Sequence, residues 1–115
     1  MSKQPETLFK ERVVRRLKEI PGLWVEKIQQ VGIRGTPDLL ICYRGYFIAW
    51  ELKTDRGRVE PLQQFKLDEI EKSGGIARIV RPKNLGLHLA ELLALTNPSK
   101  KRRRNETQSC ISSSR

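Results

Sequence analysis

The sequence predicts a single α/β domain in which helices cover both faces of a mixed β-sheet. Three observations favour this fold class: apolar residues recur at helical spacing over residues 7–20, two β-rich runs are separated by only two residues, and residues 47–50 are consecutively apolar. A run of the last kind is typical of a central strand that is buried on both sides. The 115 residues suffice for one domain with a modest core and are too few for two.

The first helix is predicted over residues 7–20, where Thr7 can act as the N-cap. Its apolar positions recur every three or four residues, at Phe9, Val13, Leu17 and Ile20. A Pro-Gly pair ends the helix, and residues 23–31 then have the composition of a strand. Residues 32–37 contain two glycines and a proline, and we expect a turn there.

Two further β-rich runs, residues 38–43 and 46–53, are separated only by Arg44 and Gly45. A two-residue break that ends in glycine is a signal for a β-hairpin. The second run contains the four consecutive apolar residues, so we expect it to be the central strand.

A second helix is predicted over residues 61–73, because proline is favoured at the first helical position and Pro61 stands there. Two glycines end it, a short strand follows at residues 76–80, and a last helix spans residues 85–95. The predicted order of elements is therefore α-β-β-β-α-β-α, a mixed sheet with helices on both faces.

The net charge is +10, and about half of the excess lies in residues 98–115, which hold six Lys or Arg and one Glu. We expect a folded domain over residues 1–97 and a disordered tail over 98–115, since the tail has too few apolar side chains to form a core. The domain alone has 17 basic and 12 acidic residues. Basic charge on both parts points to a polyanionic partner, most often nucleic acid. A basic protein without such a partner has the same composition.

Composition also excludes several kinds of protein. No apolar run is long enough to cross a membrane, and the charged N-terminus lacks the apolar centre of a secretory signal. Cys42 lies in a β-rich run and Cys110 in the tail, which argues against a structural disulfide. His88 is the single histidine, which argues against zinc catalysis, and we assign it no chemical role. An intracellular, cytoplasmic protein is expected.

The hairpin brings two acidic residues together. If Tyr43 pairs with Tyr46, the same register sets Asp38 opposite Glu51, with their Cβ atoms about 5 Å apart on one face of the sheet. Lys53 follows Glu51 on that face, since side chains alternate along a strand. Opposed, half-buried carboxylates repel each other, and a hard divalent cation such as Mg²⁺ removes that repulsion. In the alternative interpretation, Lys53 only neutralises Glu51 and Asp38 caps a turn.

Two more polar residues can be directed at the same place. Glu11 lies on the flank of the apolar stripe of the first helix and can look across towards the sheet. Gln63 heads a row with Leu67 and Ile70 on the second helix, at four- and three-residue spacing. Taken separately, each residue has a simpler explanation, as a solvated charge and as a surface amide.

These residues resemble the PD-(D/E)XK nuclease superfamily: Pro37-Asp38 is followed, after a hairpin-sized gap, by Glu51-Leu52-Lys53. With Glu11, Lys27, the run from Arg34 to Asp38, and Pro61-Leu62-Gln63 ahead of Gly74, the ordered set is similar to the VRR-NUC family. The resemblance covers roughly residues 8–81. It implies a restriction-endonuclease-like fold and a structure-specific DNA endonuclease, acting on branched or junction DNA, of the kind found in phages and bacteria.

The resemblance also implies roles for single residues. Asp38, Glu51 and the backbone carbonyl of Leu52 would bind Mg²⁺, for which Mn²⁺ substitutes, and Lys53 would position the attacking water. Glu11 would hold a second metal ion or a metal-bound water, and Gln63 would orient the nucleophile.

DNA and a second copy of the chain, in a homodimer, are the expected partners. Basic residues expected to contact phosphates are Lys27, Arg34, Lys100, Lys101, Arg102, Arg103 and Arg104. Two other functions fit the same composition: a non-catalytic nucleic-acid-binding module on this scaffold, and a structural domain whose basic charge is incidental. The preferred DNA structure is left open, and RNA is not excluded.

Overall fold

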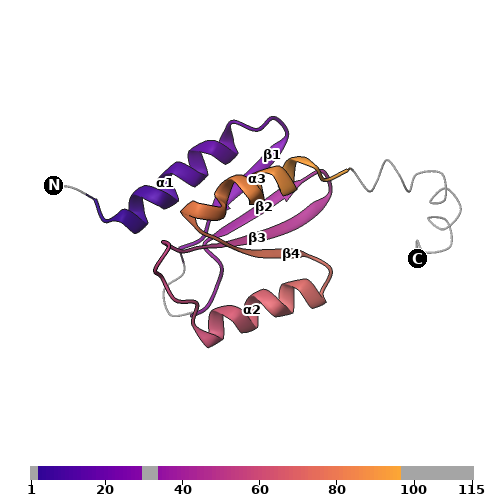
Figure 1. Ribbon diagram of the computed structural model, residues 1–115. Coiled ribbons are helices and arrows are strands. Elements are labelled where there is room, and N and C mark those ends of the chain that lie inside the picture. Colours follow the sequence, from indigo (N-terminus) through magenta and orange to yellow (C-terminus); the bar gives the residue numbers. More distant parts are fainter. Residues whose placement is uncertain (1–2, 30–33, 97–115) are drawn as a thin grey trace, which may run out of the picture.

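The computed structural model describes residues 3–29 and 34–96 (Figure 1). The order of elements over these residues is the predicted one, with a short 3₁₀-helix added before the last helix. The elements are α1 (Pro5–Lys18), β1 (Leu23–Lys27), β2 (Leu39–Tyr43), β3 (Tyr46–Leu52), α2 (Pro61–Lys72), β4 (Ile76–Val80), η1 (Pro82–Asn84) and α3 (Leu85–Leu93). No helix in these ranges is long and apolar enough to span a bilayer.

The four strands form one sheet in the order β1-β2-β3-β4. The first three are antiparallel neighbours, and β4 runs parallel to β3 after the crossover through α2. Helices α1 and α3 lie on one face of the sheet and α2 lies on the other (Figure 1). The prediction of a mixed sheet with helices on both faces is therefore confirmed.

The hairpin has the predicted register, in which Tyr43 pairs with Tyr46 and Leu39 with Trp50. Its two turn residues both have positive φ, 53° at Arg44 and 88° at Gly45. Such a pair of values is found in type I′ turns, whose twist matches that of the flanking strands. This turn fixes which residues share a face farther along both strands.

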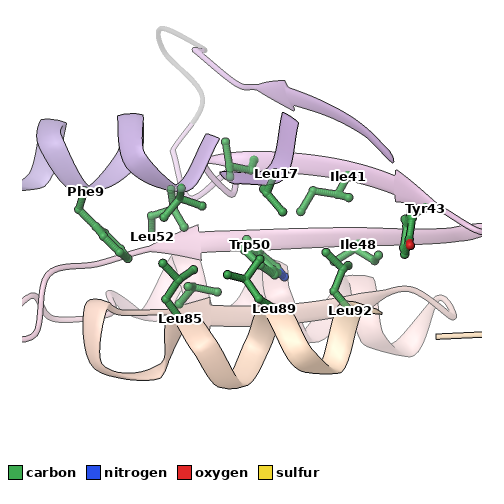
Figure 2. Packing of buried hydrophobic residues seen from close by; sticks show 13 residues of the cluster. Phe9, Leu17, Ile41, Tyr43, Ile48, Trp50, Leu52, Leu85, Leu89 and Leu92 are labelled. Atoms are coloured by element: carbon green, nitrogen blue, oxygen red, sulfur yellow. The ribbon is translucent and has the colours of Figure 1, made fainter. Parts of the chain in front are cut away.

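The core lies between the sheet and the pair α1 and α3 (Figure 2). Alternate residues of β2 and β3 point into it, among them Ile41 and Trp50, which are 0% and 1% exposed. Each helix contributes three buried side chains at helical spacing: Phe9, Val13 and Leu17 from α1, and Leu85, Leu89 and Leu92 from α3. Burial of each such side chain stabilises the fold by about 1.5–3 kcal/mol. The other residues of β2 and β3 therefore face α2.

The structure differs from prediction at the exposed end of the central strand. Phe47 was expected to be buried on account of its apolar neighbours, but it is 48% exposed. It lies on the α2 face at the hairpin end of β3, where α2 has already ended at Lys72 and Gly74 turns the chain with a φ of 101°. The continuous burial of β3 on both faces begins at Ile48.

Element boundaries differ from prediction by a few residues. Helix α1 begins at Pro5, β1 ends at Lys27, and α3 ends at Leu93. The predicted end of the first strand, at residues 30–31, and the predicted tail at 98–115 lie outside the described residues.

The outer edge of β4 is occupied by side chains. Glu71 accepts a hydrogen bond from the Ala77 N–H at 2.7 Å, and Arg78 donates to the Ala77 carbonyl at 2.9 Å. Asn84 donates to the Ile79 carbonyl at 3.5 Å. The guanidinium of Arg78 also forms ion pairs of 2.9 Å with Glu71 and 2.7 Å with Glu91, and so joins β4 to α2 and α3.

Replacing Arg78 by alanine should destabilise the fold by about 1 kcal/mol, because it removes two ion pairs that share one guanidinium. The check is urea unfolding at low and high salt, where the difference from the wild type should shrink as salt is added. Arg58→Ala, in an exposed loop, is the matched control and should leave the midpoint unchanged. An Arg78 variant as stable as this control would show that the ion pairs of Arg78 with Glu71 and Glu91 do not stabilise the fold.

Candidate active site

Asp38 lies directly before β2, at the end of the sheet, and both of its carboxylate oxygens have partners. Oδ2 accepts a hydrogen bond from the backbone N–H of Leu52 at 2.8 Å, which ties the start of β2 to the end of β3. Oδ1 accepts one from the ammonium group of Lys10 at 3.1 Å. The side chain is 21% exposed, so it remains accessible to a small ligand.

Glu51 follows Trp50 on β3 and is only 3% exposed. The register that pairs Trp50 with Leu39, continued by one residue, sets Glu51 opposite Asp38. Its Oε2 accepts a hydrogen bond from Nε2 of Gln63 at 2.9 Å and lies 3.7 Å from Nζ of Lys53. Its Oε1 is buried and has no hydrogen-bond partner in the part of the chain that the structure describes. A buried polar atom without a hydrogen-bond partner destabilises the fold by about 1–3 kcal/mol, so a cation bound by this oxygen would remove that cost.

The surroundings of Glu51 disfavour its charged form. Burial raises the pKa of its carboxyl group, and the negative charge of Asp38 raises it further. The positive charges of Lys53 and Lys10 oppose both effects, but the pKa still lies at about 7. Two acidic groups are thus held close together with too little compensation to keep both fully ionised at neutral pH. A divalent cation would supply the missing positive charge.

Lys53 and Gln63 lie beside Glu51, as expected from the alternation along the strand and from the row of residues on the second helix. Lys53 follows β3 on the Glu51 face and its side chain is 18% exposed. Gln63 lies in the first turn of α2, where its Oε1 accepts a hydrogen bond from the N–H of Glu60 at 2.9 Å. Its amide group is therefore held at both ends, between the start of α2 and the carboxylate of Glu51.

The structure does not bring Glu11 to this cluster. Glu11 is 38% exposed, forms an ion pair of 2.7 Å with Lys3, and lines a surface cavity of about 500 Å³ together with Lys27. Helix α1 covers the face of the sheet opposite to Glu51, and the residue of α1 that reaches Asp38 is Lys10.

Sequence reasoning missed Lys10, although a signal for it exists. Lys10, Val14 and Leu17 are spaced by four and three residues, so Lys10 heads a row that faces inward. This is the pattern that singled out Gln63 on the second helix. Glu11 lies about 100° farther around the helix, on the outer side of Val14.

The predicted phosphate-contacting residues lie in different settings. Lys27 also lines a cleft of about 250 Å³ beside Asp38 and Lys10. The side chain of Arg34 is 81% exposed and lies 3.8 Å from Glu60. The five basic residues of the tail, Lys100 to Arg104, are outside the described residues.

Two residues set aside on sequence grounds lie away from the acid pair. The His88 ring lies on α3 with its centroid 6.4 Å from that of Trp50, and its Nδ1 is 3.4 Å from Glu91. Cys42 is exposed on β2 as a free thiol.

The donor groups at the acid pair suit a hard divalent cation. Within residues 3–29 and 34–96, no three His, Cys, Asp or Glu side chains cluster as a metal site, so a cation would have two carboxylate ligands. Backbone N–H and C=O groups of one strand residue point towards the same neighbour, and the N–H of Leu52 points to Asp38. The Leu52 carbonyl therefore faces the same edge. Mg²⁺ is typically bound by one or two carboxylates, and water molecules fill its remaining coordination positions.

Comparisons with known proteins concern the fold. The sequence matches no model of a known protein family and no curated protein. One solved structure, described as "VRR_NUC domain", matches with a TM-score of 0.67 and 23% identity over 76% of this chain and 97% of its own. The chain has the VRR_NUC fold.

A second structure, described as "VRR_NUC domain protein", matches with a TM-score of 0.68 and 17% identity over 84% of this chain and 94% of its own. Both alignments extend over nearly the whole of the known domain. At these identities the similarity lies in the arrangement of the backbone. The VRR_NUC fold anticipated from the motif residues is thus confirmed, and the chemistry has to be inferred from the residues of this chain.

Proposed function

We propose that this VRR_NUC-fold protein is a Mg²⁺-dependent nuclease that hydrolyses phosphodiester bonds in DNA. The observation that carries the proposal is the unpartnered, buried Oε1 of Glu51 beside a second carboxylate, that of Asp38. Buried carboxylate oxygens of structural ion pairs are as a rule hydrogen-bonded, and this one has no such partner in the described residues. The similarity of the fold to VRR_NUC domains supports the same proposal.

Asp38, Glu51 and the carbonyl of Leu52 are the groups that would hold Mg²⁺ or Mn²⁺. When bound, the ion lowers the pKa of a coordinated water molecule and polarises the phosphate. Gln63 fixes Oε2 of Glu51 by a hydrogen bond, which leaves Oε1 as the oxygen free for a ligand. Lys53, on the same face, would stabilise negative charge that develops on the phosphate oxygens and would orient the attacking water.

The substrate proposed is DNA of branched structure, cleaved by a homodimer. The charge of +10 favours a polyanion. The cleft of about 250 Å³ that Asp38 lines also contains Lys10 and Lys27, whose positive charges would attract a phosphate backbone to the acid pair. Two copies would bring two such clefts to a junction.

A non-catalytic nucleic-acid-binding module is the second candidate, and one observation favours it. Lys10 and Lys53 approach the two carboxylates within 3.1 Å and 3.7 Å, so two positive charges already face two negative ones. A site that is balanced without metal would need no cation. This candidate predicts DNA binding that survives chelation and no cleavage of any DNA form.

The deciding experiment is a cleavage assay on labelled linear, flapped and four-way DNA with Mg²⁺, with Mn²⁺, and with EDTA. We expect cleavage with either ion, none with EDTA, and a preference for the branched forms. A gel-shift assay in EDTA, on the same substrates, should still show binding that weakens as salt is raised. Binding without cleavage of any substrate in either metal would favour the second candidate.

A further inference from the structure

Two of the four carboxylate oxygens of the acid pair bond neither to the backbone nor to Gln63, and one of these two accepts a hydrogen bond from a lysine. Oδ2 of Asp38 is used by the backbone N–H of Leu52, and Oε2 of Glu51 is used by Gln63. The remaining oxygens are Oε1 of Glu51, which has no partner in the described ranges, and Oδ1 of Asp38. The ammonium group of Lys10 lies 3.1 Å from that Oδ1.

Lys10 and a divalent cation would therefore compete for the same atom. A carboxylate oxygen that accepts one hydrogen bond still has a lone pair for a cation, but the charge-assisted bond to Lys10 holds a positive charge beside Oδ1, where a metal ion would have to approach. Like charges a few Å apart also repel strongly in a partly buried site, and the side chains of Lys10 and Asp38 are only 22% and 21% exposed.

We propose that Lys10 is an intramolecular cation that occupies part of the metal site and has to leave Oδ1 of Asp38 before a divalent ion can bind there. This inference rests on the proposed function, since it assumes that Asp38 and Glu51 are metal ligands. Lys10 thereby lowers the affinity of the site for a divalent ion without itself binding the ion.

Lys10 has a second acidic partner, Glu6, besides Asp38. Its Nζ lies 3.1 Å from Oε2 of Glu6, one helical turn earlier on α1, as well as from Asp38. The side chain of Glu6 is 62% exposed, so the ammonium group can stay paired while it moves towards solvent. Glu6 thus favours the released position of Lys10.

The test is titration of the metal-free protein with Mn²⁺, followed by calorimetry and by the electron paramagnetic resonance signal of the free ion, without DNA. Lys10→Gln should bind Mn²⁺ at least about tenfold more tightly than the wild type, because a neutral amide replaces the competing charge. Glu6→Gln should bind about two- to threefold more weakly, because Lys10 then has only Asp38 as its partner.

Lys18→Gln is the matched control, since Lys18 is an exposed lysine on the same helix outside the site, and its affinity should equal that of the wild type. Misfolding cannot imitate the tighter binding expected of Lys10→Gln. Binding that depends on Asp38 but is unchanged or weaker in Lys10→Gln would overturn the role of Lys10 and leave the nuclease proposal intact. Absence of Mn²⁺ binding in all variants at millimolar concentration would overturn both.

Discussion

Replacing Asp38 or Lys53 by alanine should reduce DNA cleavage by about a thousandfold or more, to the background of the assay, while DNA binding is largely retained. Asp38 supplies one of the two carboxylates at the site, and Lys53 supplies the ammonium group beside Glu51 on the same face. Phosphate contacts elsewhere on a basic surface supply most of the affinity, so binding should change little. The measurement is single-turnover cleavage of the preferred substrate, with a gel shift in EDTA.

The choice of variants matters because Asp38 also has a structural role. Alanine at position 38 leaves the Leu52 N–H without its acceptor. Asp38→Asn keeps an amide oxygen for that N–H and removes the charge, so it separates loss of chemistry from loss of fold. Lys72→Ala, at the exposed end of α2, is the control for loss of a positive charge. Wild-type rates in Asp38→Asn or Lys53→Ala would refute the assignment.

Without metal, the protein should become less stable as pH rises from 5.5 to 8.5, by about 2 kcal/mol through Glu51 alone. The pKa of Glu51 is raised from 4.5 to about 7 in the fold. Between these values the folded state retains a proton that the unfolded state has lost, so stability falls with rising pH and levels off above 7. Urea unfolding at several pH values, with EDTA, measures this slope.

Glu51→Gln isolates the contribution of this group from all others that titrate. The variant should lose that part of the pH dependence and be more stable than the wild type at pH 8.5. Addition of Mg²⁺ at that pH should stabilise the wild type and not the variant. If the free energy of unfolding changed with pH in the same way in both proteins, the pKa of the Glu51 carboxyl group would not be raised in the fold.

The juxtaposition of Asp38 and Glu51 could be predicted because it depends on local information. Arg44 and Gly45 specify a two-residue turn, the turn specifies the register, and the register decides which side chains share a face. Gln63 could be placed because helix α2 follows a clear start at Pro61. None of these inferences needed knowledge of how the helices pack.

The contribution of α1 could not be predicted in the same way. Whether Lys10 or Glu11 reaches the acid pair depends on how the helix is rotated and shifted against the sheet, which packing decides. Chemical expectation favoured the carboxylate, and the structure places the ammonium group there instead. The exposure of Phe47 likewise depends on where α2 ends relative to the hairpin, which the strand's own apolar sequence does not record.

The occupied edge of β4 restricts how copies of this protein can associate. An open sheet edge is a template on which another chain can add a strand, and so a route to fibrous aggregation. Here Glu71, Arg78 and Asn84 bind the outward backbone groups of Ala77 and Ile79. A continuous intermolecular sheet through β4 would first have to break these bonds. Self-association by strand addition is thereby disfavoured at β4.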